Sequence, residues 1–191
     1  MADQNPDLGE KREVKASAGV VGGLSIQDLI LIAVLLAAGA VLKLTVATFL
    51  TVAGMRPNFI IATYCLAILL TRATPVQSLV IGLLAGLICQ LPMMAGTPWL
   101  NLISEPLGGL TMGLLILVPM KFGKFDANPV ISTFAATVVS GYAYVFALAV
   151  VNGISIPVAA VSYAFMVFAT AAFNCILVGI LTPPLKKVLK R

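Results

Sequence analysis

Residues 157–181 read PVAAVSYAFMVFATAAFNCILVGIL and contain no charged side chain. A helix needs about 20 consecutive apolar residues to cross the hydrocarbon core of a bilayer, and this stretch of 25 residues is longer than that. A second run, 129–151, is also free of charge. The two runs predict an integral membrane protein of the all-α class.

The composition of the whole chain supports this assignment. Of its 191 residues, 60% are apolar and 10% are charged, whereas about a quarter of the residues in a soluble domain are charged. The mean hydropathy is +1.07. Six apolar runs predict six transmembrane helices, at residues 26–50, 58–70, 76–91, 106–120, 129–151 and 157–181. The second, third and fourth are too short to span alone, which a bundle tolerates where the remaining backbone lines a protected cavity.

The basic residues predict the orientation of these helices. Six crossings place both termini on one side, where ten of the twelve Lys and Arg residues fall, and only Lys43 and Arg56 lie toward the other side. Because Lys and Arg are enriched in cytoplasmic loops, we expect a multi-pass protein of the cell membrane with both termini in the cytoplasm. The expected parts are a disordered cytoplasmic tail at 1–23, a six-helix domain at 24–185 and a basic cytoplasmic C-terminus at 186–191.

The residue types that are missing exclude several kinds of chemistry. The chain has no His, so neither an imidazole base nor a His-ligated metal site can form. The Gly123-Lys124 pair lacks the upstream glycine of a phosphate-binding loop. The three cysteines lie in apolar runs, where thiols pack as small hydrophobes, and the cations form no stripe with interleaved aromatics. We expect no enzymatic activity, metal, cofactor or nucleic-acid partner.

Two connections on the predicted outer side are unusually apolar. They read TVAGMRPN at 51–58 and PMMAGTPWLN at 92–101. Both are interrupted by Gly and Pro and hold almost no charge, unlike ordinary solvated loops. We expect them to act as lids over an outward-facing pocket.

Polar and aromatic side chains near these connections suit a small zwitterion or a polar-headed aromatic compound. Arg56 can hold a carboxylate through two hydrogen bonds, and Glu105 can accept hydrogen bonds from an ammonium group. Tyr and Trp rings can stack on an aromatic substrate or contact a cation. The predicted substrate-binding residues are Arg56, Asn58, Trp99, Asn101, Glu105, Tyr142, Tyr163 and Asn174.

Several of these residues also have a simpler structural interpretation. Trp99 fits an interfacial aromatic belt, and Arg56 can extend to lipid headgroups. Glu105, directly before a proline, can sit at a helix N-terminus and be stabilised by its dipole. An interhelical hydrogen bond alone accounts for Asn174. Lys43 interrupts an apolar run near its outer end and is a further candidate for the pocket wall.

Small residues predict where helices approach closely, because helix association in lipid depends on backbone packing. Two glycine pairs with GxxxG spacing, at 82/86 and 109/113, predict packing within the bundle. Ala33 and Ala37 belong to a stripe of small residues in the predicted cytoplasmic half of the first helix. That stripe predicts a docking surface for another membrane protein.

Four blocks of sequence form a recognisable pattern: GAVL at 39–42, GMRPN at 54–58, QSLVIG at 77–82 and GTPWLNLISEP at 96–106. The pattern resembles the substrate-binding S components of energy-coupling factor (ECF) transporters, most closely the tryptophan-transporter type, from the first helix to the sixth. The Ala-x-x-x-Ala docking motif of that family matches Ala33 and Ala37. At Ser104-Glu105 the tryptophan type has an acidic residue followed by a basic one, so the charge pattern differs there.

The resemblance implies a six-helix membrane subunit that captures tryptophan from outside. It would deliver the substrate together with a transmembrane coupling subunit and two ATPase subunits. In that family the S component is thought to topple within the bilayer, with the first helix as the sliding surface. Two alternatives stay open: an S component for another vitamin or aromatic metabolite, and a structural or regulatory membrane subunit that binds no small molecule.

Overall fold

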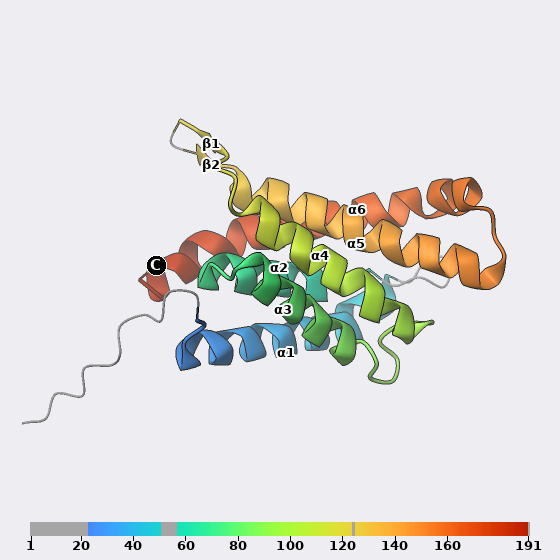
Figure 1. Cartoon of the computed structure of the whole chain (residues 1–191), viewed down its shortest axis with the longest axis horizontal. Helices are drawn as coiled ribbons and strands as arrows, with labels where there is room; N and C mark the ends of the chain where they lie inside the picture. Colours follow the sequence, from blue (N-terminus) through green and yellow to red (C-terminus); the bar gives the residue numbers. More distant parts are fainter. Residues whose placement is uncertain (1–22, 51–56, 124, 191) are drawn as a thin grey trace, which may run out of the picture.

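The computed structural model describes residues 23–50, 57–123 and 125–190, and in these it is helical apart from one short hairpin. Figure 1 shows the helices packed side by side in a bundle. They are α1 (Ile26–Phe49), α2 (Ile60–Thr71), α3 (Pro75–Ile88), the 3₁₀ helix η1 (Pro98–Leu100), α4 (Asn101–Leu115), α5 (Asn128–Asn152) and α6 (Ile156–Val188). Strands β1 (Lys121–Phe122) and β2 (Phe125–Asp126) form an antiparallel hairpin between α4 and α5. The expected all-α class is confirmed.

Three helices, α1, α5 and α6, are long and apolar enough to cross a membrane. Helices α2 and α3 are apolar but shorter, as the lengths of their sequence runs predict. The outer faces of the long helices carry large apolar side chains such as Val161 and Phe165, each more than three-quarters exposed. So large an apolar surface is suited to lipid and not to water.

Helix α2 lies at the centre of the bundle. It contacts each of the other five α-helices, and ten of its residues are buried, among them Tyr64 and Cys65 with no exposed surface. A helix that is apolar on all sides is stable only when protein or lipid surrounds it completely. Helix α2 can therefore be stable with only twelve residues, because the neighbouring helices bury ten of them.

The two ends of the bundle differ in charge. Figure 1 shows that the start of α1, the β1–β2 hairpin and the C-terminal end of α6 lie at one end of the molecule. We call this the basic end, since most of the described cations are there: Arg72, Lys121, Lys186, Lys187 and Lys190. The opposite end, with the α3–η1 connection and the α5–α6 turn, is called the cavity end below.

Helices α3 and α4 touch through their backbones. A Cβ atom added at Gly82 would collide with the carbonyl oxygen of Glu105, and one added at Gly109 would collide with the carbonyl oxygen of Ser78. Glycine is the residue that permits such an approach between helices. The glycines of the first predicted GxxxG pair therefore pack against α4, and those of the second pack against α3.

The start of α4 differs from the sequence expectation. The helix begins at Asn101, so Pro106 lies inside it and not at its first turn. It starts early because η1, opened by Pro98, leads directly into it, and Asn101 Nδ2 donates to the Pro98 carbonyl at 3.0 Å. Glu105 is consequently an interior helical residue, and the interpretation of Glu105 as a helix-terminal residue is wrong.

The end of α6 also differs. The helix continues beyond residue 181 through Pro183 and Pro184, although each proline removes one backbone donor. The Thr182 hydroxyl donates to the Val178 carbonyl at 2.6 Å in the turn before them. The first residues of the predicted C-terminal segment 186–191 therefore belong to this helix.

Substitution of the glycines between α3 and α4 should destabilise the bundle. We expect Gly82→Ala and Gly109→Ala each to lower the free energy of unfolding by about 1–3 kcal/mol, because the added methyl group meets backbone and not a mobile side chain. Thermal unfolding of the purified protein in detergent measures this.

Gly179→Ala in α6 is the matched control. Its Cβ would lie 3.5 Å from Val130 Cγ2, an ordinary contact, and alanine favours the helix over glycine. The midpoint of thermal unfolding of Gly179→Ala should stay the same or rise. Equal losses in all three variants would contradict a specific close approach of α3 and α4.

Candidate functional site

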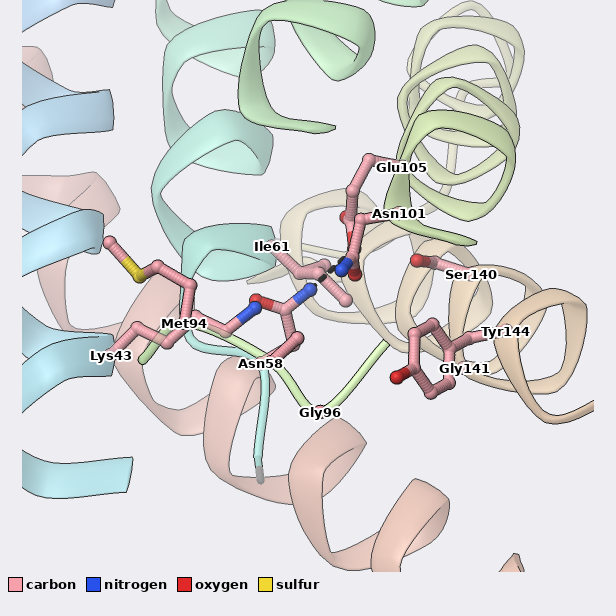
Figure 2. A pocket seen from close by; sticks show the side chains of 11 residues that line it. Lys43, Asn58, Ile61, Met94, Gly96, Asn101, Glu105, Ser140, Gly141 and Tyr144 are labelled. Carbon is pink, nitrogen blue, oxygen red and sulfur yellow. Dashed lines mark hydrogen bonds between the residues drawn. The ribbon is translucent and has the colours of Figure 1, made fainter. Parts of the chain in front are cut away.

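A small polar cavity lies at the cavity end of the bundle, where α1, α2, α4 and α5 come together (Figure 2). Its volume is about 40 Å³, enough for about three water molecules. The residues that line it are Lys43, Asn58, Ile61, Met94, Ala95, Gly96, Asn101, Glu105, Ser140, Gly141 and Tyr144. Three of the eight predicted substrate-binding residues, Asn58, Asn101 and Glu105, are among them.

Glu105 is the acid of this cavity. Its side chain is 1% exposed, and Figure 2 shows it pointing from α4 toward Asn58. Asn58 Nδ2 donates a hydrogen bond to Glu105 Oε1. The hydroxyl groups of Tyr64 and Ser140 also interact with this carboxylate. Neutral polar groups from α2, α5 and the segment before α2 therefore lie around the acid, although Glu105 Oε2 has no hydrogen-bond partner among the described residues.

Lys43 is the base of the same cavity. It comes from α1, is 2% exposed, and its Nζ donates to Cys89 Sγ at 3.2 Å. A thiol is a weak acceptor, so this contact compensates little of the desolvation of the ammonium group. Lys43 and Glu105 interact electrostatically, yet they form no direct ion pair among the described residues. Two opposite charges thus face one buried space without touching each other.

An amide network extends from the cavity to α6. Asn174 Nδ2 donates to the backbone oxygen of Asn58 at 3.2 Å and to Thr137 Oγ1 at 3.3 Å. Within the described part of the chain, Oδ1 of Asn58 and Oδ1 of Asn174 are buried acceptors without a donor. Such atoms are rare in folded proteins and mark a place where a further donor, from water or a ligand, is accommodated.

The other predicted residues lie elsewhere. Trp99 is on η1, 49% exposed, and does not line the cavity. Tyr142 packs against Phe146 and Phe168, with ring centroids 5.5 and 6.2 Å away. Tyr163 packs on the apolar cluster formed between α5 and α6. Arg56 lies outside the described residues, so its predicted role stays a prediction.

Helix α5 lines the cavity through residues other than Tyr142, the residue of this helix in the predicted substrate-binding set. Ser140 and Tyr144 line it from this helix, and the buried hydroxyls of Thr133 and Thr137 continue the same face. The spacing 133, 137, 140 and 144 places these side chains on one side of a helix. A polar stripe of this kind inside a chargeless span is a signal that the sequence does contain.

A second cavity of about 390 Å³ lies between the end of α1, the start of α2 and α6. Pro57 and Phe59, the neighbours of Asn58 in sequence, both line it. Phe59 and Phe173 pack in its wall with ring centroids 4.5 Å apart and ring planes tilted by 40°. It is almost wholly apolar and rich in phenylalanine, so it offers aromatic surface directly beside the polar cavity.

Comparisons with protein-family models, with curated proteins and with solved structures found no match. The site is therefore interpreted from its own chemistry. That chemistry is a buried acid, a separate buried base and unsatisfied amide acceptors within a helical bundle whose longest helices can cross a membrane.

The electrostatic coupling of Lys43 and Glu105 can be tested by stability measurements. Lys43→Met leaves the Glu105 carboxylate without its counter-charge, and Glu105→Gln does the same to the ammonium group. Each single variant should lose about 3–5 kcal/mol of unfolding free energy, because it leaves one buried charge uncompensated. The double variant should recover most of that loss, measured by denaturant or thermal unfolding in detergent.

Lys187→Met serves as the matched control, since Lys187 is exposed at the basic end, and it should leave stability unchanged. Strict additivity of the two single effects in the double variant would show that the charges are independent. In that case Lys43 and Glu105 would not act as a coupled acid–base pair.

Proposed function

We propose that this chain is the substrate-binding S component of an ECF-type uptake transporter and that it captures an amino-acid zwitterion, with tryptophan as the first candidate. In this proposal the six helices cross the cell membrane, both termini are cytoplasmic and the cavity end faces outward. The observation that carries the proposal is the buried acid and base, Glu105 and Lys43, which line one cavity without pairing directly.

The arrangement of charge in the bundle supports the orientation. The described cations other than Lys43 gather at the basic end, and cytoplasmic faces are enriched in Lys and Arg. Lys43 is buried in the cavity at the opposite end. An ionisable residue at membrane depth that faces the bundle interior is, by default, a candidate for a functional role.

The chemistry of the cavity supports a zwitterion as the substrate. The Glu105 carboxylate can accept from an α-ammonium group, and Lys43 can donate to an α-carboxylate. The unsatisfied Oδ1 atom of Asn58, which lines the cavity, adds a neutral acceptor for the remaining N–H donors. Lys43 thereby takes the part in anion binding that the sequence suggested for Arg56, or shares it with Arg56.

The size of the cavity requires a change of conformation on binding. Pockets for organic ligands have volumes of about 300–1,000 Å³, and the described cavity has about 40 Å³. Met94, Ala95 and Gly96 line it, and Met94 has no exposed surface. Entry of a complete amino acid therefore requires displacement of the α3–η1 connection, which is the segment expected to act as a lid.

The surface of α1 supports a partner subunit. Ala33 and Ala37 are exposed on the outward face of this helix, next to large exposed side chains such as Ile30 and Val34. Small residues on an outer face permit the close approach of another transmembrane helix. In this proposal the partner is the coupling subunit, which carries the two ATPases that supply energy.

Ligand binding tests the substrate. Tryptophan at about one hundred times its Kd should stabilise the purified protein by about 2.7 kcal/mol, seen as a higher unfolding midpoint. Tryptamine, which lacks the carboxylate, and indole-3-propionate, which lacks the ammonium group, should give little shift. Lys43→Met and Glu105→Gln should abolish the response, whereas Lys187→Met should retain it.

The results separate the parts of the proposal. A shift with another vitamin or aromatic metabolite, and none with tryptophan, would replace the substrate and keep the S component. Absence of any shift over amino acids, vitamins and aromatic metabolites would favour a structural membrane subunit.

Docking on α1 is tested separately. Ala33→Leu or Ala37→Leu should abolish co-purification with the coupling subunit, because the added side chain separates the two helices, and should leave ligand-induced stabilisation unchanged. Ala172→Leu is the matched control, since Ala172 is exposed on the outer face of α6. Loss of ligand binding with normal assembly would contradict the assignment of α1 as the docking helix.

A further inference from the structure

The basic end contains a cavity that the proposed function does not use. Its volume is about 370 Å³, and it lies where α2, α4, α6 and the β1–β2 hairpin come together. The residues that line it are Leu69, Leu70, Arg72, Ile116, Leu117, Val118, Pro119, Met120, Lys121, Asp126, Asn128 and Lys186. One wall is apolar, and the rest carries three cations and one carboxylate.

The cavity has an excess of positive charge. Lys186 Nζ lies 4.0 Å from Asp126 Oδ2, so this cation already has a partner. Arg72 and Lys121 make no ion pair with another described residue. Arg72 also adopts a left-handed backbone conformation, with φ 50° and ψ 43°, which glycine or asparagine usually occupies at such a position. Three cations therefore share one carboxylate in this cavity, and two of them form no direct ion pair with a described residue.

Three helix ends lie at the cavity: α2 ends at Thr71, α4 ends at Leu115 and α5 begins at Asn128. The carbonyl oxygens of Leu115 and Val118 at the end of α4 accept hydrogen bonds from Asn128 Nδ2 at 3.0 and 2.7 Å. These two carbonyl oxygens therefore already have a hydrogen-bond donor. Helix α5 begins at Asn128, whose backbone N–H donates to Asp126 Oδ1 at 3.2 Å, so the partial positive charge of this helix N-terminus already faces a carboxylate oxygen. The attraction of an anion to this cavity therefore comes from the side chains of Arg72 and Lys121.

We propose that this cavity binds the headgroup of an anionic phospholipid, with the phosphate group on Arg72 and Lys121 and the glycerol and upper acyl chains along Leu117 and Val118. The combination of cations with exposed apolar side chains at the end of a membrane bundle matches such an amphipathic ligand. Basic pockets between transmembrane helices bind anionic lipid headgroups in this way. The inference depends on the membrane location of the bundle and not on its substrate.

The first measurement compares lipids on the delipidated full-length protein in a neutral detergent. Dioleoyl-phosphatidylglycerol should raise the unfolding midpoint and remain bound in native mass spectrometry. Dioleoyl-phosphatidylcholine, which has the same acyl chains and no net charge, should do neither. Glycerol 3-phosphate, which has the phosphate without acyl chains, should give no shift at the same concentration.

Variants locate the binding site. Arg72→Gln and Lys121→Gln should each weaken phosphatidylglycerol binding about fivefold, the effect of removing one cation near a membrane surface. Lys187→Gln and Lys190→Gln are matched controls, since both residues lie at the basic end but do not line the cavity, and they should bind as the unmodified chain does. Asp126→Asn should bind more tightly, because it releases Lys186 and keeps an acceptor for the Asn128 amide.

The increase expected for Asp126→Asn cannot arise from misfolding, so the proposal remains testable even if a cation variant is unstable. If all four cation variants lost the same amount of phosphatidylglycerol affinity, the lipid would be held by the general positive charge of the basic end, and the proposed site would be wrong. An equal shift with glycerol 3-phosphate would overturn the lipid in favour of a soluble phosphate ester. Equal binding of phosphatidylcholine would overturn the role of charge.

Discussion

The position of the buried acid depends on the contact between the backbones of α3 and α4. At Gly82 the helices are so close that even a methyl group would meet the carbonyl oxygen of Glu105. Because both sides of this contact are main chain, neither can move without displacing a whole helix. The contact thereby holds the Glu105 side chain against Asn58 and the central helix α2, and the cavity forms around it.

Burial of charge in a membrane bundle limits how such a site can be built. A lone carboxylate or ammonium group in an apolar interior has a large desolvation penalty. Here the acid receives neutral donors, and a base lies across the same cavity. Amide and hydroxyl groups such as those of Asn58, Ser140 and Asn174 add polarity without further charge. The result is a polar interior that remains close to electrical neutrality.

The sequence predicted the helices more accurately than the cavity, for physical reasons. The length of a chargeless run directly determines a span, so α5 at Asn128–Asn152 matches the expected 129–151 closely. The start of α4 differs from the expectation because a proline such as Pro106 is favoured in a first helical turn, whereas Pro98 begins the helical path earlier. Trp99 was selected for its residue type, but whether its ring faces inward depends on the packing of η1. Sequence identifies polar residues, and only tertiary packing shows which of them share a space.

The charged side chains at the two ends of the bundle are arranged differently. The cavity that holds Lys43 and Glu105 is enclosed, and its charges balance, so a ligand with one charge of each sign preserves the balance. A ligand with only one charge would leave a buried partner uncompensated. The basic end is exposed and has an excess of cations, so it attracts anions through interactions that salt screens over about 10 Å at 0.1 M. In the two proposals, depth in the bundle separates selective recognition of a small solute from attraction to an anionic surface, and both would follow from where a few Lys and Arg residues lie relative to the helix ends.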